Sequence, residues 1–144
     1  MAMIRRSIHY SIRLRPVRRA EALDCLFDFH RPLRSLPGIS RAFSRRGGVL
    51  GLRICEAGGT CFIERRLSQS ARHLGYCIVS APMPVVSYRA EIRYRPGASA
   101  DLLWHCSFLV DASQVESMTR FFTGLYRRSL QPWMLPGSAR LRIT

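Results

Sequence analysis

The chain of 144 residues contains no Lys and no Asn, so all 23 of its basic residues are Arg. Both missing residues are encoded by A-rich codons, which indicates a GC-rich genome in which Arg replaces Lys on ordinary solvated surface. With 9 acidic residues the formal net charge is +14, which taken alone suggests a nucleic-acid or anionic-membrane partner. However, residues 1–53 hold 12 Arg and 3 acids, and the rest of the chain holds 11 and 6. This even spread disfavours a nucleic-acid partner and favours only weak association with anionic surfaces.

Long apolar runs are also missing. No run approaches the roughly 20 residues that a membrane-spanning helix needs. Residues 1–16 alternate basic and apolar side chains and lack the continuous apolar stretch of a secretory signal, so we expect a cytoplasmic protein. An apolar fraction of 47% is typical of a globular chain, and this length normally buries one core. We expect one domain over residues 1–132, followed by a tail, residues 133–144, whose role the sequence leaves open.

Metal and catalytic motifs are missing as well. The five cysteines include no CxxC pair, and no His lies at zinc-finger spacing, so we expect neither a metal nor another cofactor. The sequence also lacks GxSxG, HExxH, Walker and GxGxxG motifs. We interpret the cysteines as small core residues in a reducing compartment. They are Cys25, Cys55, Cys61, Cys77 and Cys106.

Strand and hairpin signals dominate the middle of the chain. Gly47-Gly48 and Gly58-Gly59 separate apolar runs, as expected for hairpin turns. The expected strands are Ile8–Leu14, Ile39–Arg45, Val49–Glu56, Cys61–Ser68, Leu74–Ser80, Val86–Arg95 and Leu102–Val110. Alternation in the last two predicts a sheet with one covered face. That face would carry Val86, Tyr88, Ala90, Ile92 and Tyr94, then Trp104, Cys106 and Phe108, while His105 would point away.

Two regions have helical periodicity. Pro16 suits a first helical turn, and apolar residues follow at helical spacing until the helix must end by His30, ahead of Pro32. The apolar residues are Val17, Ala20, Leu23, Leu26 and Phe27. Near the C-terminus, Ser113 and Glu116 fit a capping box that opens a helix ended by Pro132. Its apolar stripe is Val115, Met118, Phe121, Phe122, Leu125, Tyr126 and Leu130.

This order of elements predicts an α+β helix-grip fold. A curved antiparallel sheet of about seven strands would wrap round the long C-terminal helix, with two short helices after the first strand. A set of residues in the same order along the chain carries a resemblance to a known family. They are Asp28-Phe29, Pro37-Gly38-Ile39, Gly51-Leu52-Arg53, Glu64-Arg65-Arg66-Leu67, Tyr76-Cys77-Ile78, Pro82-Met83-Pro84-Val85 before Tyr88, Trp104, Phe108 and Tyr126. With these residues the chain resembles the polyketide cyclase/dehydrase and lipid-transport family of the START (SRPBCC) superfamily over about residues 7–130.

The resemblance implies an internal cavity for a hydrophobic ligand such as a lipid, a quinone or a polyketide. The ligand-binding candidates lie on the predicted covered faces, where core packing is the alternative role for each of them. They are Tyr76, Tyr88, Ile92, Trp104, Phe108, Met118, Phe122 and Tyr126. A buried Tyr hydroxyl seeks a hydrogen-bond partner and could orient a ligand carbonyl.

Three functions remain open at this point. The favoured one is non-catalytic binding or transport of a small hydrophobic ligand. The alternative is a cyclase or dehydratase, for which Glu64 is the candidate base, although a surface ion pair is the plainer role for that residue. Arg53 and Arg65 could pair with an anionic head group. The third is an interaction protein that uses its basic surface on RNA, the ribosome or a membrane.

Overall fold

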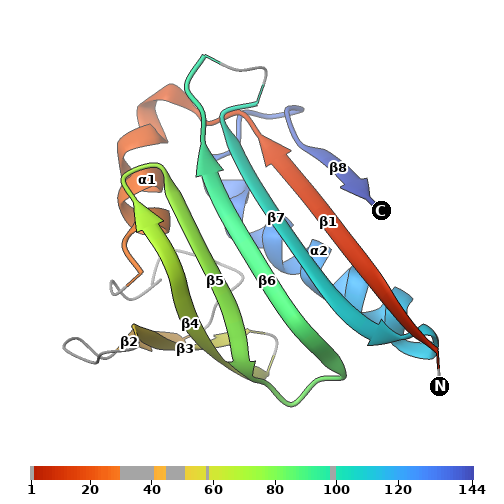
Figure 1. Ribbon diagram of the computed structural model, residues 1–144. Helices are drawn as coiled ribbons and strands as arrows, with labels where there is room; N and C mark the ends of the chain where they lie inside the picture. The colour runs from red at the N-terminus through yellow and green to blue at the C-terminus, as the bar shows by residue number, and fades with distance from the viewer. Residues whose placement is uncertain (1, 30–40, 45–50, 58, 98–99) are drawn as a thin grey trace.

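Eight strands form a single antiparallel sheet in the order β2-β3-β4-β5-β6-β7-β1-β8 (Figure 1). The computed structural model describes residues 2–29, 41–44, 51–57, 59–97 and 100–144, with the backbone alone at 41–44. The strands are β1 (Met3–Ile12), β2 (Arg41–Ser44), β3 (Leu52–Ala57), β4 (Thr60–Ser70), β5 (His73–Ser80), β6 (Val85–Tyr94), β7 (Leu102–Asp111) and β8 (Arg140–Ile143). The sheet supports the cavity described below.

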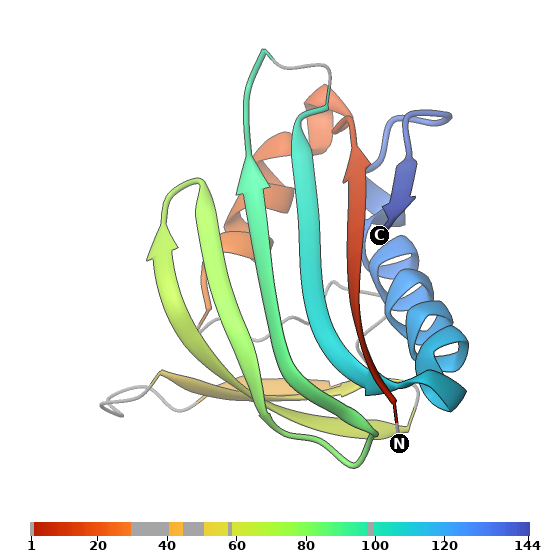
Figure 2. The ribbon, with the colours of Figure 1, turned by 45° about the vertical axis from the view of Figure 1, so that its right-hand side comes forward.

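The helices α1 (Arg19–Phe27) and α2 (Val115–Leu130) both lie on one side of the sheet. The sheet curves toward that side, so its inner face is covered and its outer face is open (Figures 1 and 2). In β7 the burial alternates strictly, and Trp104, Cys106 and Phe108 point inward as predicted. The helix-grip architecture is therefore confirmed. In the part of the chain that the structure describes, neither helix is long and apolar enough to cross a membrane.

The start of α2 differs from the expected capping box. Asp111 is the capping residue: its Oδ1 accepts hydrogen bonds from the backbone N–H of Ser113 at 2.9 Å and from the Ser113 hydroxyl at 2.5 Å. A 3₁₀ turn, η2 (Ala112–Gln114), then leads into α2. Glu116 instead reaches Arg6 at 3.8 Å. An Asp cap two residues earlier satisfies the first turn equally well, so the predicted box was wrong.

The end of α2 is close to the prediction. The α-helix ends at Leu130, and Pro132 lies directly after it within another 3₁₀ turn, η3 (Gln131–Trp133). A proline lacks only an N–H that the start of a helical turn does not use, so it is tolerated there.

The predicted apolar face of the first helix is only half right. Leu26 and Phe27 are buried, but Val17 is 90% exposed and Ala20 is exposed. The helical segment starts with a 3₁₀ turn, η1 (Pro16–Arg18), which has about 3.0 residues per turn against about 3.6 in the α-helix that follows. This change rotates the first apolar residues away from the sheet. A second short helix would fall within residues 30–40, outside the described residues, as does Gly47-Gly48.

A β-bulge alters the predicted alternation of β6. Val86 was expected on the covered face but is 54% exposed. Ser87 has a φ of 55°, and the pairing with β7 shifts register between Val86 and Arg89. The extra residue moves Val86 outward, while Tyr88, Ala90, Ile92 and Tyr94 stay buried as predicted.

Residues 133–144, for which the sequence predicts no element, pack onto the sheet. Trp133 is fully buried, and its carbonyl accepts a hydrogen bond from the N–H of Arg15 at 2.8 Å. Further along, β8 pairs with β1, where Arg142 lies opposite His9 and Ile143 opposite Ile8. The tail thus adds an eighth strand to the sheet.

Candidate ligand-binding cavity

A narrow cavity lies between the inner face of the sheet and the two helices. Its volume, as the space open to the centre of a water molecule, is about 20 Å³, which is room for about one water. The side chains around it come from α1, α2 and strands β3 to β7. They are Leu26, Arg53, Cys55, Ala57, Phe62, Glu64, Tyr76, Ile78, Tyr88, Ile92, Trp104, Phe122 and Leu125. A hydrophobic ligand would therefore have to displace side chains in order to enter.

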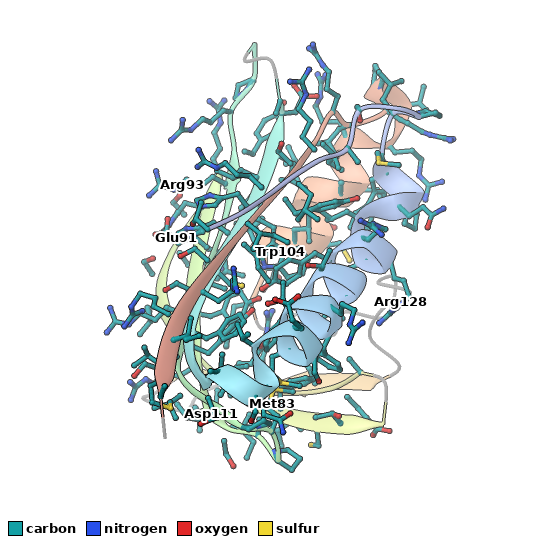
Figure 3. All side chains as sticks on the ribbon, turned by 90° about the vertical axis from the view of Figure 1, so that its right-hand side faces the viewer. Met83, Glu91, Arg93, Trp104, Asp111 and Arg128 are labelled. Atoms are coloured by element: carbon teal, nitrogen blue, oxygen red, sulfur yellow. The ribbon has the colours of Figure 1, made fainter. Side chains whose placement is uncertain are left out.

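Five of the eight predicted ligand-binding residues line this cavity, and whether they bind a ligand stays a prediction. They are Tyr76, Tyr88, Ile92, Trp104 and Phe122. Figure 3 shows Trp104 between the sheet and α2. The other three lie in the packing around the cavity. The Tyr126 ring stacks on Trp104 with centroids 4.3 Å apart, the Phe108 ring lies 5.2 Å from Phe122, and Met118 is half-buried against the core.

Glu64 is neither free nor on the surface, because it forms a buried ion pair with Arg53. The pair joins Arg53 Nε to Glu64 Oε1 at 2.7 Å, and the two residues are 4% and 8% exposed. They lie opposite each other on β3 and β4, and a register shift in the pairing of β4 with β5 falls between Ile63 and Glu64. The guanidinium carbon also lies 4.5 Å from the centroid of the Phe29 ring and 5.1 Å from that of Tyr76. The prediction that Glu64 forms an ion pair on the surface was therefore wrong about the location, because the pair is buried.

The charge of Arg53 is held in place by these neighbours. Burial is the strongest single influence and lowers the pKa of Arg53, but Glu64, followed by Cys55 and Tyr76, together outweigh burial, so that the net pKa is raised. Arg53 is therefore positively charged. Its Nη1 is buried and has no hydrogen-bond partner among the residues that the structure describes. A buried donor without a partner costs free energy, so an acceptor placed beside Nη1 would be stabilised.

The cavity thiol is not a nucleophile. Cys55 Sγ donates a hydrogen bond to Glu64 Oε1 at 3.4 Å. Burial, and then the negative charge of Glu64, raise the pKa of Cys55. Since the thiolate is the reactive form, Cys55 acts here as a packing group and a weak donor.

Neutral phenols form the second polar feature of the site. Trp104 Nε1 donates a hydrogen bond to the Tyr76 hydroxyl at 3.1 Å, and the hydroxyls of Tyr88 and Tyr126 are hydrogen-bonded to each other. Burial raises the pKa of all three tyrosines well above the usual value. They can therefore donate or accept hydrogen bonds but do not act as phenolate bases.

Two other candidates lie away from the cavity. Arg65 is exposed and follows the inward-facing Glu64, so it does not share the pocket with Arg53. His105 points outward as predicted, and its ring stacks on His9 with centroids 4.1 Å apart. Within the described ranges, no group of three or more His, Cys, Asp or Glu is placed to hold a metal ion.

From the sequence, Arg53 was named as a candidate, but Cys55 and Ala57 were not placed at the cavity. The three residues alternate along β3 and share its buried face, a signal that the polar Arg obscured. Cys61 is exposed and Cys77 half-buried, so the prediction of buried cysteines holds only for Cys25, Cys55 and Cys106.

Among comparisons with known proteins, only the comparison with solved structures found similar proteins. No protein-family model matches the sequence, and no curated protein matches it. The solved structure of the protein XoxI from Bacillus cereus is similar, with 23% identity, a TM-score of 0.63 and coverage of 91% of this chain and 92% of that one. A START superfamily protein from Mycobacterium smegmatis is similar at 11% identity and a TM-score of 0.55, covering 90% and 94%.

A further similar structure is the di-domain ARO/CYC StfQ from the steffimycin biosynthetic pathway. It has 7% identity and a TM-score of 0.63, and the match covers 90% of this chain and 48% of that one. Identities this low establish the fold and no more. With the sheet order, the curvature and the covering helix, they show that this chain has a helix-grip fold.

Proposed function

We propose that the protein binds or carries a small hydrophobic ligand that presents one neutral oxygen acceptor to Arg53. The observation that carries this proposal is the unpartnered Nη1 of a buried guanidinium in an otherwise largely apolar cavity. A carrier needs this combination, because apolar walls supply affinity and a few placed polar groups fix orientation.

The charge balance of the site favours a neutral ligand group. Arg53 is already paired with Glu64, so an added carboxylate would meet the Glu64 charge as well as the guanidinium. A carbonyl or hydroxyl oxygen satisfies Nη1 without that repulsion. The Tyr76 hydroxyl, which lines the same cavity, is a second group that could orient the oxygen.

Ligand entry requires the cavity to widen. Phe122 and Leu125 on α2 and Leu26 on α1 close the space that the sheet leaves open. If these side chains move, a flat or narrow ligand can enter the cavity. Each of them can change rotamer without breaking a hydrogen bond. A START superfamily protein and an ARO/CYC have the same fold, which fits a ligand-binding role for this chain.

A cyclase or dehydratase is the second candidate, and one observation favours it. Arg53, Glu64 and two Tyr hydroxyls all line the same cavity, so it is not wholly apolar. Binding is nevertheless the better proposal, because Glu64 Oε1 already accepts hydrogen bonds from Arg53 and Cys55, and a carboxylate paired with a guanidinium is a weak base.

The test is a pair of ligands of one shape, an aromatic ketone and the hydrocarbon in which CH₂ replaces the carbonyl, titrated by calorimetry. A hydrogen bond to a charged group is worth about 1.5–3 kcal/mol, so the ketone should bind about 10- to 100-fold more tightly. In the variant Arg53→Met/Glu64→Leu, which keeps the cavity apolar and neutral, this preference should vanish. Equal binding of both ligands to the natural chain, or binding of neither, would overturn the proposal.

A further inference from the structure

The outer face of the sheet is uncovered and basic. Side chains that alternate with the core residues of β6, β7 and β1 point away from both helices, toward the viewer of Figure 1, and the β8 residues paired with them share that side. Figure 3 shows Glu91 and Arg93 on the side of the sheet opposite α2. We call this surface the outer basic face. Its residues are Arg5, His9, Arg72, His73, Arg89, Glu91, Arg93, Arg95, His105, Arg140 and Arg142.

Folding gathers charges that the sequence spreads out. Strand pairing sets His105 between Glu91 and His9, and His9 beside Arg142 of the tail strand. Arg89, Arg95, Arg140 and Arg142 are all exposed. The even distribution of Arg along the chain therefore understates how much positive charge one surface presents.

Two hollows on this face share the same pair of arginines. One, of about 330 Å³, is lined by Arg72, His73 and Tyr94 together with Arg93 and Arg95. The other, of about 160 Å³, is lined by His9, His105, Glu91 and Leu103, again with Arg93 and Arg95. Arg93 is paired with Glu91 through Nε at 2.8 Å and Nη2 at 2.7 Å, so the exposed Arg95 is the shared arginine offered to phosphate. Guanidinium groups bind phosphate through paired N–H donors, so neighbouring hollows joined by Arg95 suit successive phosphates of one polyanion.

The stacked histidines add a titratable element. Burial, and then the neighbouring His105 and Arg142, lower the pKa of His9. Burial also lowers the pKa of His105; Glu91 opposes this, and Arg142 and Arg93 act with it. Both rings are therefore neutral at neutral pH. Bound phosphate would favour their protonated forms, so a polyanion should bind more tightly as the pH falls.

We infer that the outer basic face binds single-stranded nucleic acid through its phosphate backbone. The face is convex, because the sheet curves toward the helices (Figure 2). A flexible single strand can follow such a surface, whereas a stiff duplex or a flat bilayer meets it only along a narrow strip. The stacked His pair also offers an aromatic surface to a base. This activity is independent of the cavity.

The test uses a fluorescein-labelled oligouridylate of about 20 nucleotides, which exceeds the usual site size of one small domain. Fluorescence anisotropy is followed at several salt concentrations. The variant Arg89→Gln/Arg95→Gln/Arg142→Gln removes three charges from the face. We expect a loss of at least about tenfold in affinity near 0.1 M salt, and a salt slope shallower by about 2, since each phosphate contact contributes about 0.7. Lowering the pH from about 7 to about 5 should strengthen binding by the natural chain.

The matched control is Arg19→Gln/Arg120→Gln/Arg128→Gln, which removes the same charge from exposed positions on the helices. It should leave affinity within about threefold of the natural chain, by long-range screening alone. Equal losses in both variants would show diffuse attraction and overturn the inference. Absence of RNA binding, with capture by phosphatidylserine vesicles that the first variant abolishes, would assign the face to a membrane instead.

Discussion

Replacing Glu64 with Leu should destabilise the protein by about 3–5 kcal/mol, because it leaves the Arg53 charge buried without its partner. For a chain of this length that loss lowers the melting temperature by roughly 10 °C or more. Thermal and urea unfolding, followed by circular dichroism, measure both quantities. The effect should be large because both residues are almost fully buried and the guanidinium already has one unpartnered nitrogen.

Two matched variants separate loss of the ion pair from loss of packing. The double change Arg53→Met/Glu64→Leu should recover most of the lost stability, since no unpaired charge remains. Glu21→Leu breaks the exposed Arg18–Glu21 pair and should change stability by less than about 1 kcal/mol. If Glu64→Leu were as stable as the natural chain, or the double variant no better than the single one, the buried pair would not exist as described.

Replacing Trp133 with Ala should cost about 3–5 kcal/mol, the usual loss for a fully buried large aromatic side chain. Trp133 is the point at which the C-terminal residues enter the core, and its carbonyl accepts a hydrogen bond from Arg15. The next residue, Met134, forms an isolated β-bridge with Leu14, two residues beyond the end of β1. Loss of the Trp133 ring should therefore loosen β8 as well. Urea unfolding gives the free energy, and hydrogen exchange at Arg142 and Thr144 reports on β8.

The control for this variant is Leu135→Ala, two residues away and 41% exposed, which should change stability by less than about 1 kcal/mol. A natural-like stability of Trp133→Ala would mean that residues 133–144 do not pack on the sheet.

Local pattern was enough to predict the elements whose burial alternates without interruption. In β7 each second residue is buried, and in α2 the capped, amphipathic stretch is too long to lie anywhere but across the curved sheet. The pattern of apolar residues gave wrong faces where a local irregularity shifts which residues of a strand or helix point toward the core. The bulge at Ser87 turned Val86 outward, and the 3₁₀ turn before α1 turned Val17 outward. Neither change has a signal in residue polarity.

The site was harder to predict, because its key contact is set by strand register. Burial of Arg53 and Glu64 depends on the pairing of β3 with β4, which no local pattern specifies. The short strand β8 was missed for a similar reason: four residues carry little periodicity, and the edge of β1 determines where they pair. Aromatic residues on predicted inner faces were the reliable signal, and four such residues line the cavity: Tyr76, Tyr88, Trp104 and Phe122.

Methyl NMR during titration with the aromatic ketone tests the cavity most directly. Binding between sheet and helix should shift the methyl signals of Leu26, Ile78, Ile92 and Leu125, which line the cavity, and leave Leu103 on the outer face and Ile143 at the sheet edge unchanged. Shifts confined to Leu103 and Ile143, or no shifts at a saturating concentration of ketone, would contradict an internal ligand site.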